Sequence, residues 1–134
     1  MTLTRYRHRP PVRSGQQVFA YRNLHRAGWS LRATDGEHAG LVVAHAGEVI
    51  IGGARFVVRE SGRQRVLREH RKNVHAGVIG GVLFEEDFHP DVRVTYDPYR
   101  WGTFVNAETG EPITEAVKVY LDPNGKAWAQ GVGY

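Results

Sequence analysis

The sequence contains no cysteine, and it has no apolar run of the roughly 20 residues that a membrane-spanning helix requires. The chain therefore cannot form a disulfide scaffold, a thiolate metal site or a cysteine nucleophile. It also lacks a nucleophile elbow, a Walker loop and a dinucleotide-binding glycine motif. The basic N-terminus carries no apolar segment of the secretory type. These absences predict a cytoplasmic protein that does not associate with membranes and that binds a partner rather than catalysing a reaction.

The sequence also lacks motifs that are typical of metal-binding sites. The seven histidines show no tight ligand spacing such as H-E-x-x-H, so we expect no metal site. The carboxylates of residues 85–91 crowd one segment, which is typical of an acidic surface loop. No cofactor is expected from any motif in the chain.

What the sequence does contain is typical of one globular domain. Its 134 residues are 41% hydrophobic and 24% charged, which suits a chain that buries a core. Residues 1–15 combine four arginines with a Pro-Pro pair and no acid, and they predict a flexible basic arm. Residues 16–134 are expected to form a single β-rich domain.

Short apolar runs separated by turn residues indicate mostly antiparallel strands. Residues 92–96 and 117–121 alternate apolar and polar side chains, and residues 122–125 (Asp-Pro-Asn-Gly) are the strongest turn signal in the chain. The run at residues 49–51 is expected to stop at Gly52-Gly53, with a new strand at 56–58. This pattern predicts a mainly β fold, an antiparallel barrel or sandwich.

One segment departs from the β pattern. Residues 61–72 are rich in Arg, Gln, Leu and Glu, which favours one short helix capped by Ser61. A long β-arm is the alternative for this segment.

Charge is distributed unevenly along the chain. Residues 1–84 carry 14 Lys+Arg and 5 Asp+Glu, whereas residues 85–134 carry 4 and 9. This division predicts a dipolar surface, which favours an anionic partner or head-to-tail contacts between copies.

The basic side chains are densest in residues 55–75, where seven Lys+Arg meet only two acids. Arginine presents a planar fork that fits phosphate oxygens. The alternative is a solvated helix whose bases pair with local glutamates or with the acidic second half. The candidate phosphate-binding residues are Arg63, Arg65, Arg68, Arg71, Lys72, Asn73 and His75.

A second cluster, in residues 96–101, places three aromatic residues around a proline turn. Tyr96, Tyr99 and Trp101 are candidates for stacking on a nucleotide base. More often such aromatic residues close one end of a β-barrel, and Arg100 could instead form a cation–π contact with Trp101.

Three segments carry a resemblance to a known group of proteins. They are Tyr21–His25 with Trp29–Arg32, Gly62–Arg68 with Arg71–Ala76, and Tyr96–Tyr99 with Thr103–Val105. Over roughly residues 18–130 the chain resembles small uncharacterised proteins of tailed phages and prophages, although Gly77 replaces the aromatic expected after Ala76. The resemblance implies a protein that acts in the cytoplasm of an infected bacterial host. Small phage proteins with basic, aromatic-lined pockets often work against host defence, and some are oligomeric sponges for nucleotide signals.

Three hypotheses follow. The first is a non-enzymatic, homo-oligomeric protein that captures a nucleotide, such as a cyclic defence signal. The second is an RNA- or DNA-binding protein that uses the same basic face. The third is a structural protein that assembles by basic-to-acidic contacts between copies.

Overall fold

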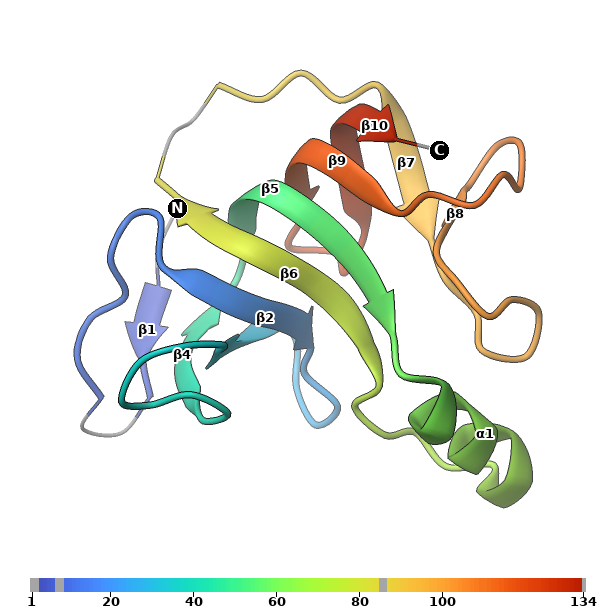
Figure 1. The fold of residues 1–134 in the computed structure, drawn as a ribbon, viewed down its shortest axis with the longest axis horizontal. Coiled ribbons are helices and arrows are strands. Elements are labelled where there is room, and N and C mark those ends of the chain that lie inside the picture. The colour runs from blue at the N-terminus through green and yellow to red at the C-terminus, as the bar shows by residue number, and fades with distance from the viewer. Residues whose placement is uncertain (1–2, 7–8, 85–86, 134) are drawn as a thin grey trace.

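The computed structural model describes residues 3–6, 9–84 and 87–133. Ten strands and one short helix follow one another along this part of the chain (Figure 1). The elements are β1 (Leu3–Arg5), β2 (Gln17–Arg22), β3 (Trp29–Ala33), β4 (Val42–Ala46), β5 (Val49–Val58), α1 (Glu60–Glu69), β6 (Ala76–Leu83), β7 (Val92–Thr95), β8 (Val105–Asn106), β9 (Glu115–Leu121) and β10 (Ala127–Gly133). The mainly β prediction with one short helix is confirmed.

All strand pairs that join the sheet are antiparallel, and the strand order is β1-β4-β3-β2-β6-β5-β9-β10-β7-β8. The sheet is open rather than closed, so of the predicted barrel or sandwich it forms no complete barrel. It is strongly curled nevertheless. The buried indole Nε1 of Trp29 in β3 donates to the carbonyl of Asp122 after β9 at 2.9 Å, although β2, β6 and β5 lie between these two strands.

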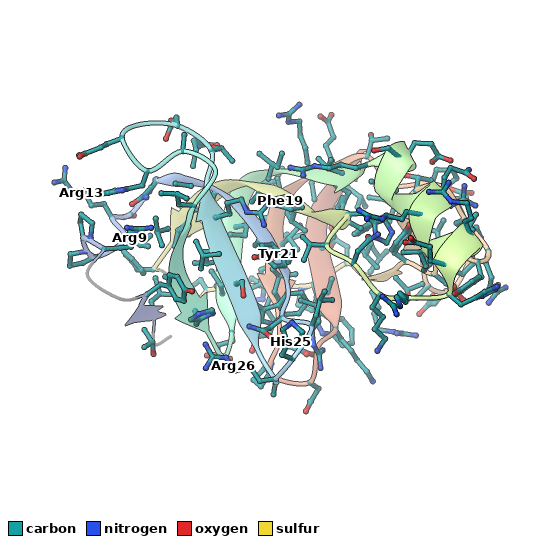
Figure 2. All side chains as sticks on the ribbon, turned by 90° about the horizontal axis from the view of Figure 1, so that it is seen from below. Arg9, Arg13, Phe19, Tyr21, His25 and Arg26 are labelled. Carbon is teal, nitrogen blue, oxygen red and sulfur yellow. The ribbon has the colours of Figure 1, made fainter. Side chains whose placement is uncertain are left out.

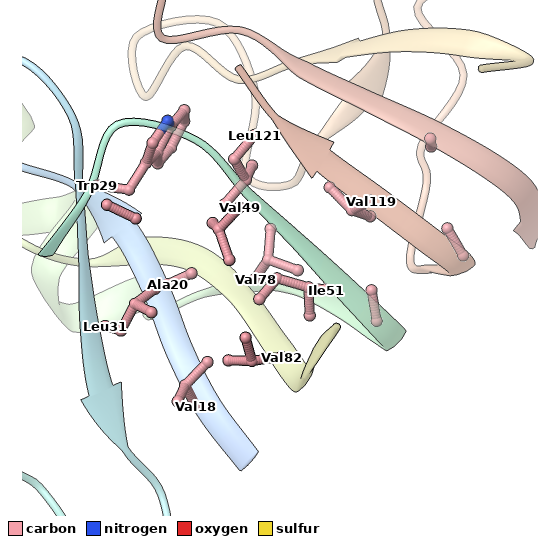
Figure 3. Packing of buried hydrophobic residues seen from close by; sticks show 14 of the residues in the cluster. Val18, Ala20, Trp29, Leu31, Val49, Ile51, Val78, Val82, Val119 and Leu121 are labelled. Atoms are coloured by element: carbon pink, nitrogen blue, oxygen red, sulfur yellow. The ribbon is translucent and has the colours of Figure 1, made fainter. Parts of the chain in front are cut away.

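The core fills the concave side of this curl (Figure 3). The alternating side chains of β2, β5, β6 and β9 meet there because successive residues of a strand point to opposite faces. Fully buried members include Val18, Leu31, Ile51, Val82 and Val119. Burying these aliphatic side chains supplies the main driving force for the fold, since each contributes about 1.5–3 kcal/mol when removed from water.

The expected break at Gly52-Gly53 is absent, because β5 runs through both glycines as one ten-residue strand. The register against β6 shifts between Gly52 and Arg55, and Gly53 has a φ of +55°. The glycines thus mark a β-bulge inside a strand rather than its end. The bulge bends β5 and contributes to the curl of the sheet.

The helix begins at Glu60 and ends at Glu69, so it is shorter than the predicted 61–72. Its N-cap residue is Arg59, and no side chain caps it, so the assignment of Ser61 as the cap is wrong. The helix ends because His70 adopts a left-handed conformation, with φ 54° and ψ 35°. Figure 1 shows α1 at one end of β5 and β6, where it connects them.

Within the segment predicted as a flexible arm, Leu3–Arg5 forms β1 and pairs with residues 44–46 of β4. Leu3 also packs against the core cluster. The boundary at residue 15 and the flexibility of the remaining arm stay predictions, and residues 7–8 lie outside the described part. No helix among the described residues is long and apolar enough to cross a membrane.

A candidate ligand-binding groove beside the helix

A groove of about 780 Å³ opens where three distant segments meet. The first is the β2–β3 turn, the second is the end of α1 with the loop that follows it, and the third is the turn after β7. We call this hollow the groove. Its lining residues are Tyr21–Leu24, Arg26, Ala27, Val66, His70, Lys72–Ala76 and Tyr96–Tyr99. All of them except Arg26, Ala27 and His70 belong to the three segments on which the phage resemblance rests.

The β2–β3 turn is shaped by Asn23. Its Oδ1 accepts hydrogen bonds from the backbone N–H groups of His25 and Arg26, and its Nδ2 donates to Ser30 Oγ. An asparagine side chain that bonds the backbone two and three residues ahead fixes a tight turn. Figure 2 shows His25 and Arg26 together at the end of this turn.

A buried polar chain joins the other two segments. His75 is 6% exposed; its Nε2 lies 2.7 Å from the hydroxyl of Tyr96, and its Nδ1 lies 2.9 Å from Oδ1 of Asn73. Because Asn73 Oδ1 can only accept, Nδ1 carries a proton, and in the neutral ring Tyr96 donates to Nε2. Asn73 Nδ2 in turn donates to the carbonyl of Gly62 in α1. This series of hydrogen bonds therefore holds the helix against the turn after β7.

Tyr96 is anchored on its ring faces as well as at its hydroxyl. Its ring stacks on Phe104 at 5.1 Å, and Phe104 packs against Phe56 at the same centroid distance. Burial raises the pKa of Tyr96 to about 12, so the phenol stays neutral at physiological pH. Tyr96 forms a rigid wall of the groove.

Arg63 fixes the turn after β7 from the helix side. Its Nε donates to the carbonyls of Pro98 and Trp101, at 3.0 and 2.9 Å, and its Nη1 pairs with Glu60 at 3.0 Å. The side chain is only 18% exposed. Arg63 is therefore a structural residue in this arrangement and does not line the groove.

The rim of the groove carries the exposed rings of Tyr99 and His70. Tyr99 is 56% exposed, and its ring lies nearly parallel to that of His70, at 10° and 6.3 Å between centroids. Trp101 lies outside the groove, where the guanidinium of Arg100 covers its ring at 4.4 Å. Of the three predicted stacking residues, Tyr99 offers the most open ring face.

The cations of the groove are Arg22, Arg26 and Lys72. None of the three forms an ion pair with a described carboxylate, because the ion pairs found among the described residues are Arg63–Glu60 and Arg65–Glu69. Asp97 is the acidic residue among the lining side chains. Its Oδ1 accepts a hydrogen bond from the backbone N–H of Tyr99, which orients it along its own turn.

A second, smaller basic hollow of about 500 Å³ lies on the other side of residues 73–75. We call it the cleft. It is lined by Arg59, Arg65, Arg68 and the single acid Glu69, together with residues 61–62 and 73–75. Arg65 pairs with Glu69 at 3.1 Å, whereas Arg59 covers the ring of Phe19 at 5.2 Å.

The structure thus divides the predicted site residues. Lys72, Tyr96 and Tyr99 line the groove, Arg65 and Arg68 line the cleft, and Asn73 and His75 form the wall that both share. Arg63, Arg71 and Trp101 line neither hollow. That any of these residues contacts a ligand stays a prediction.

Sequence reasoning missed three groove residues: Arg22, Arg26 and His70. For Arg22 and Arg26, the sequence did offer one signal, namely two basic side chains in a tight turn close to Trp29. No local pattern shows that a β-hairpin turn will face the end of a helix some 45 residues later in the chain, because that depends on the curl of the sheet.

Comparisons with known proteins cover the part of the chain that forms this groove. The family model described as "Mycobacterium phage L5 gene 82 protein" matches residues 11–129, which includes all three segments of the groove. The Gene 82 protein of Mycobacterium phage L5 is 40% identical over 117 residues, which cover 81% of this chain and 92% of that relative. No solved structure matches the chain.

Proposed function

Because the chain belongs to the family of the Mycobacterium phage L5 gene 82 protein, we propose that it is a phage-encoded binding protein whose groove captures a phosphate-bearing ligand. The ligand class that fits best is a nucleotide, and a cyclic nucleotide that signals host defence is the form we propose. One observation carries the proposal. The groove is lined by three cations that have no carboxylate partner among the described residues, and the exposed rings of Tyr99 and His70 lie at its rim.

In this arrangement Arg22, Arg26 and Lys72 bind phosphate oxygens, and Tyr99 with His70 stacks on a base. Guanidinium and ammonium groups form short, charge-assisted hydrogen bonds to phosphate. Stacking of one base on an aromatic side chain contributes about 1–3 kcal/mol. The apolar parts of Leu24, Val66 and Pro98 complete the walls and exclude water from the contact.

Titration calorimetry with a panel of cyclic and linear nucleotides tests the proposal. The double variant Arg26→Ala/Lys72→Ala removes two exposed cations whose side chains form no described hydrogen bond or ion pair, so its fold should be unaffected. Each lost charge-assisted contact should cost about 1.5–3 kcal/mol, which is roughly a ten- to hundredfold loss of affinity. The matched control is Arg65→Ala/Arg68→Ala in the cleft, which should bind like the wild type. Equal losses in both variants, or binding to no nucleotide, would refute the proposal.

The cleft favours a second candidate function, RNA or DNA binding. Two basic hollows that share the wall of residues 73–75 offer successive phosphates of one strand two places to bind. Polymer binding weakens steeply with salt because counterions are released, whereas an enclosed nucleotide is less sensitive. A labelled single-stranded RNA measured at two salt concentrations separates the two. Tight, salt-labile RNA binding that needs Arg65 and Arg68 would favour the second function.

We also propose that the protein assembles into a homo-oligomer in the host cytoplasm, since sponge-type capture usually involves several copies. Native mass spectrometry of the calorimetry samples reports the number of copies and of bound ligands. A monomer that binds one nucleotide would remove the oligomer from the proposal and leave the groove in place.

A further inference from the structure

Beside the groove lies a third hollow, of about 240 Å³, inside the curl of the sheet. It opens between the β2–β6 side and the β7–β10 side, and we call it the inner pocket. Tyr21, Arg22, Ala76 and Tyr96 line both the groove and the inner pocket, so the two hollows are immediate neighbours.

The inner pocket has the walls of a ring-binding site. Trp29, Val78, Val94, Phe104 and Leu121 supply apolar surface. No aspartate or glutamate lines it in the described part of the chain. An apolar cavity of about 150 Å³ is enough to hold a benzene ring, so this pocket has room for a nucleobase.

Arg22 stands at the junction of the two hollows. Its Cζ lies 5.9 Å from the centre of the Trp29 ring, and its guanidinium lies where a Cβ on Gly125 would be. The side chain therefore reaches from the end of β2 across to the turn before β10. A cation in this place is positioned to contact the phosphate of a ligand that has one base in the inner pocket and a second base in the groove.

From these features, and resting on the function proposed above, we propose that the ligand is a dinucleotide. One base enters the inner pocket against Trp29, the phosphate linkage meets Arg22, and the second base stacks at Tyr99 and His70. A mononucleotide would fill only one of the two ring sites and would leave the other hydrated.

The test compares the four nucleoside monophosphates with their linear and cyclic homodinucleotides by calorimetry. The best dinucleotide should bind at least about tenfold more tightly than its own monophosphate. Ala127→Leu narrows the inner pocket, because Ala127 lines it and pairs across the sheet with Leu121 and Val94, which line it too. This variant should lose the dinucleotide advantage and keep the affinity for the monophosphate. Ala107→Leu, which changes a half-buried alanine outside both hollows, is the matched control.

A second measurement needs no variant of the pocket. The indole N–H of Trp29 gives a separate NMR signal, which Trp29→Phe identifies, and its ring faces the inner pocket. The signal should shift with a dinucleotide and stay in place with a monophosphate. A monophosphate that binds as tightly as its dinucleotide and spares Trp29 would overturn this inference while the groove proposal stands. Binding of no nucleotide at all would overturn both.

Discussion

His70 combines a strained backbone conformation at the end of α1 with a ring that stacks on Tyr99. It ends α1 in the left-handed region, where an L-residue with a Cβ pays about 1–2 kcal/mol and glycine does not. Glycine would relieve this strain, so a histidine at this helix end has a structural cost. Its nearly parallel stacking with Tyr99 is the feature that glycine could not supply.

We therefore expect His70→Gly to raise the stability and lower the ligand affinity. The gain should be about 0.5–1 kcal/mol, because the larger backbone entropy of glycine offsets part of the relieved strain. Thermal unfolding should shift upward by roughly 2–4 °C. His70→Ala is the control, since it removes the ring and keeps the strain. A His70→Gly protein that melts below the wild type would show that the imidazole stabilises the fold.

Tyr96 and Tyr120 predict a loss of stability at alkaline pH. Burial raises the pKa of each phenol from 10 to about 12, and at Tyr120 the hydrogen bond to Glu48 adds to this shift. Below pH 10 both phenols are protonated in the folded and the unfolded chain, so their contribution is fully present there. Between pH 10 and about 12 the unfolded chain ionises first, and the free energy of unfolding falls.

Denaturant unfolding between pH 8 and 12 measures this loss, and Tyr96→Phe should flatten the alkaline limb. The same substitution leaves Nε2 of His75 without its partner, so at neutral pH it should cost about 1–3 kcal/mol. An alkaline limb identical to that of the wild type would show that Tyr96 ionises normally in the folded protein.

At the scale of the element, α1 is held mainly by its contacts rather than by a cap. Arg63 is mostly buried and donates to two carbonyls of the turn after β7, whereas Arg65 is 64% exposed and pairs only with Glu69. Arg63→Ala should therefore cost about 1.5–3 kcal/mol, and Arg65→Ala about 0.5 kcal/mol or less. Urea titration of both variants checks the difference. Equal costs would mean that Arg63 does not anchor the turn.

Gly62 in α1 packs closely against His75, which lies in the loop just before β6. A Cβ at this position would collide with the Cβ of His75. Alanine favours a helix over glycine by about 1 kcal/mol, but overpacking at a fixed backbone costs about 1–3 kcal/mol. Gly62→Ala should therefore leave stability unchanged or lower it by up to about 2 kcal/mol.

Ser61→Ala is the matched control on the same turn. Ser61 is exposed and caps nothing, so this change should stay within about 0.5 kcal/mol of the wild type in urea titration. A loss of about 1 kcal/mol would restore Ser61 as the cap that the sequence predicted.

The sequence was sufficient to predict several of the elements, because their patterns are local, but it missed β1 in the predicted arm. The alternation in residues 92–96 and 117–121 predicted β7 and β9, and the composition of residues 61–72 predicted α1. It failed at Gly52-Gly53, because a glycine pair has the same pattern whether it ends a strand or forms a bulge inside one. The groove was predictable only in part, since Lys72 and Tyr99 sit in distinctive segments and Arg26 does not.

At the scale of the whole molecule, the basic first part of the chain and the acidic second part do not form ion pairs with each other among the described residues. The ion pairs among the described residues lie within α1, and none joins the basic first part to residues 87–133. The alternative, in which the acidic second half neutralises the mid-chain arginines, is therefore not seen in the described part. Arg63 and Arg65 are engaged by glutamates of α1, whereas Arg68, Arg71 and Lys72 form no ion pair with a described carboxylate and remain available to an anion outside the chain.

The third hypothesis, assembly of copies by basic-to-acidic contacts, makes a prediction at this scale. Contacts between exposed charges are screened with a Debye length of about 8 Å at physiological salt and about 3 Å at 1 M. If copies assemble this way, the oligomer should dissociate between about 0.1 and 1 M salt. Sedimentation velocity at both concentrations measures this. An oligomer that persists at 1 M salt would point to an apolar interface.

The central claim is that Arg22, Arg26 and Lys72 together form an anion site, and side-chain ¹⁵N NMR tests it most directly. Titration with inorganic pyrophosphate should shift the signals of these three side chains together and to saturation, well before those of Arg65 and Arg68. Shifts that begin in the cleft, or that never saturate at any of the five residues, would contradict the claim.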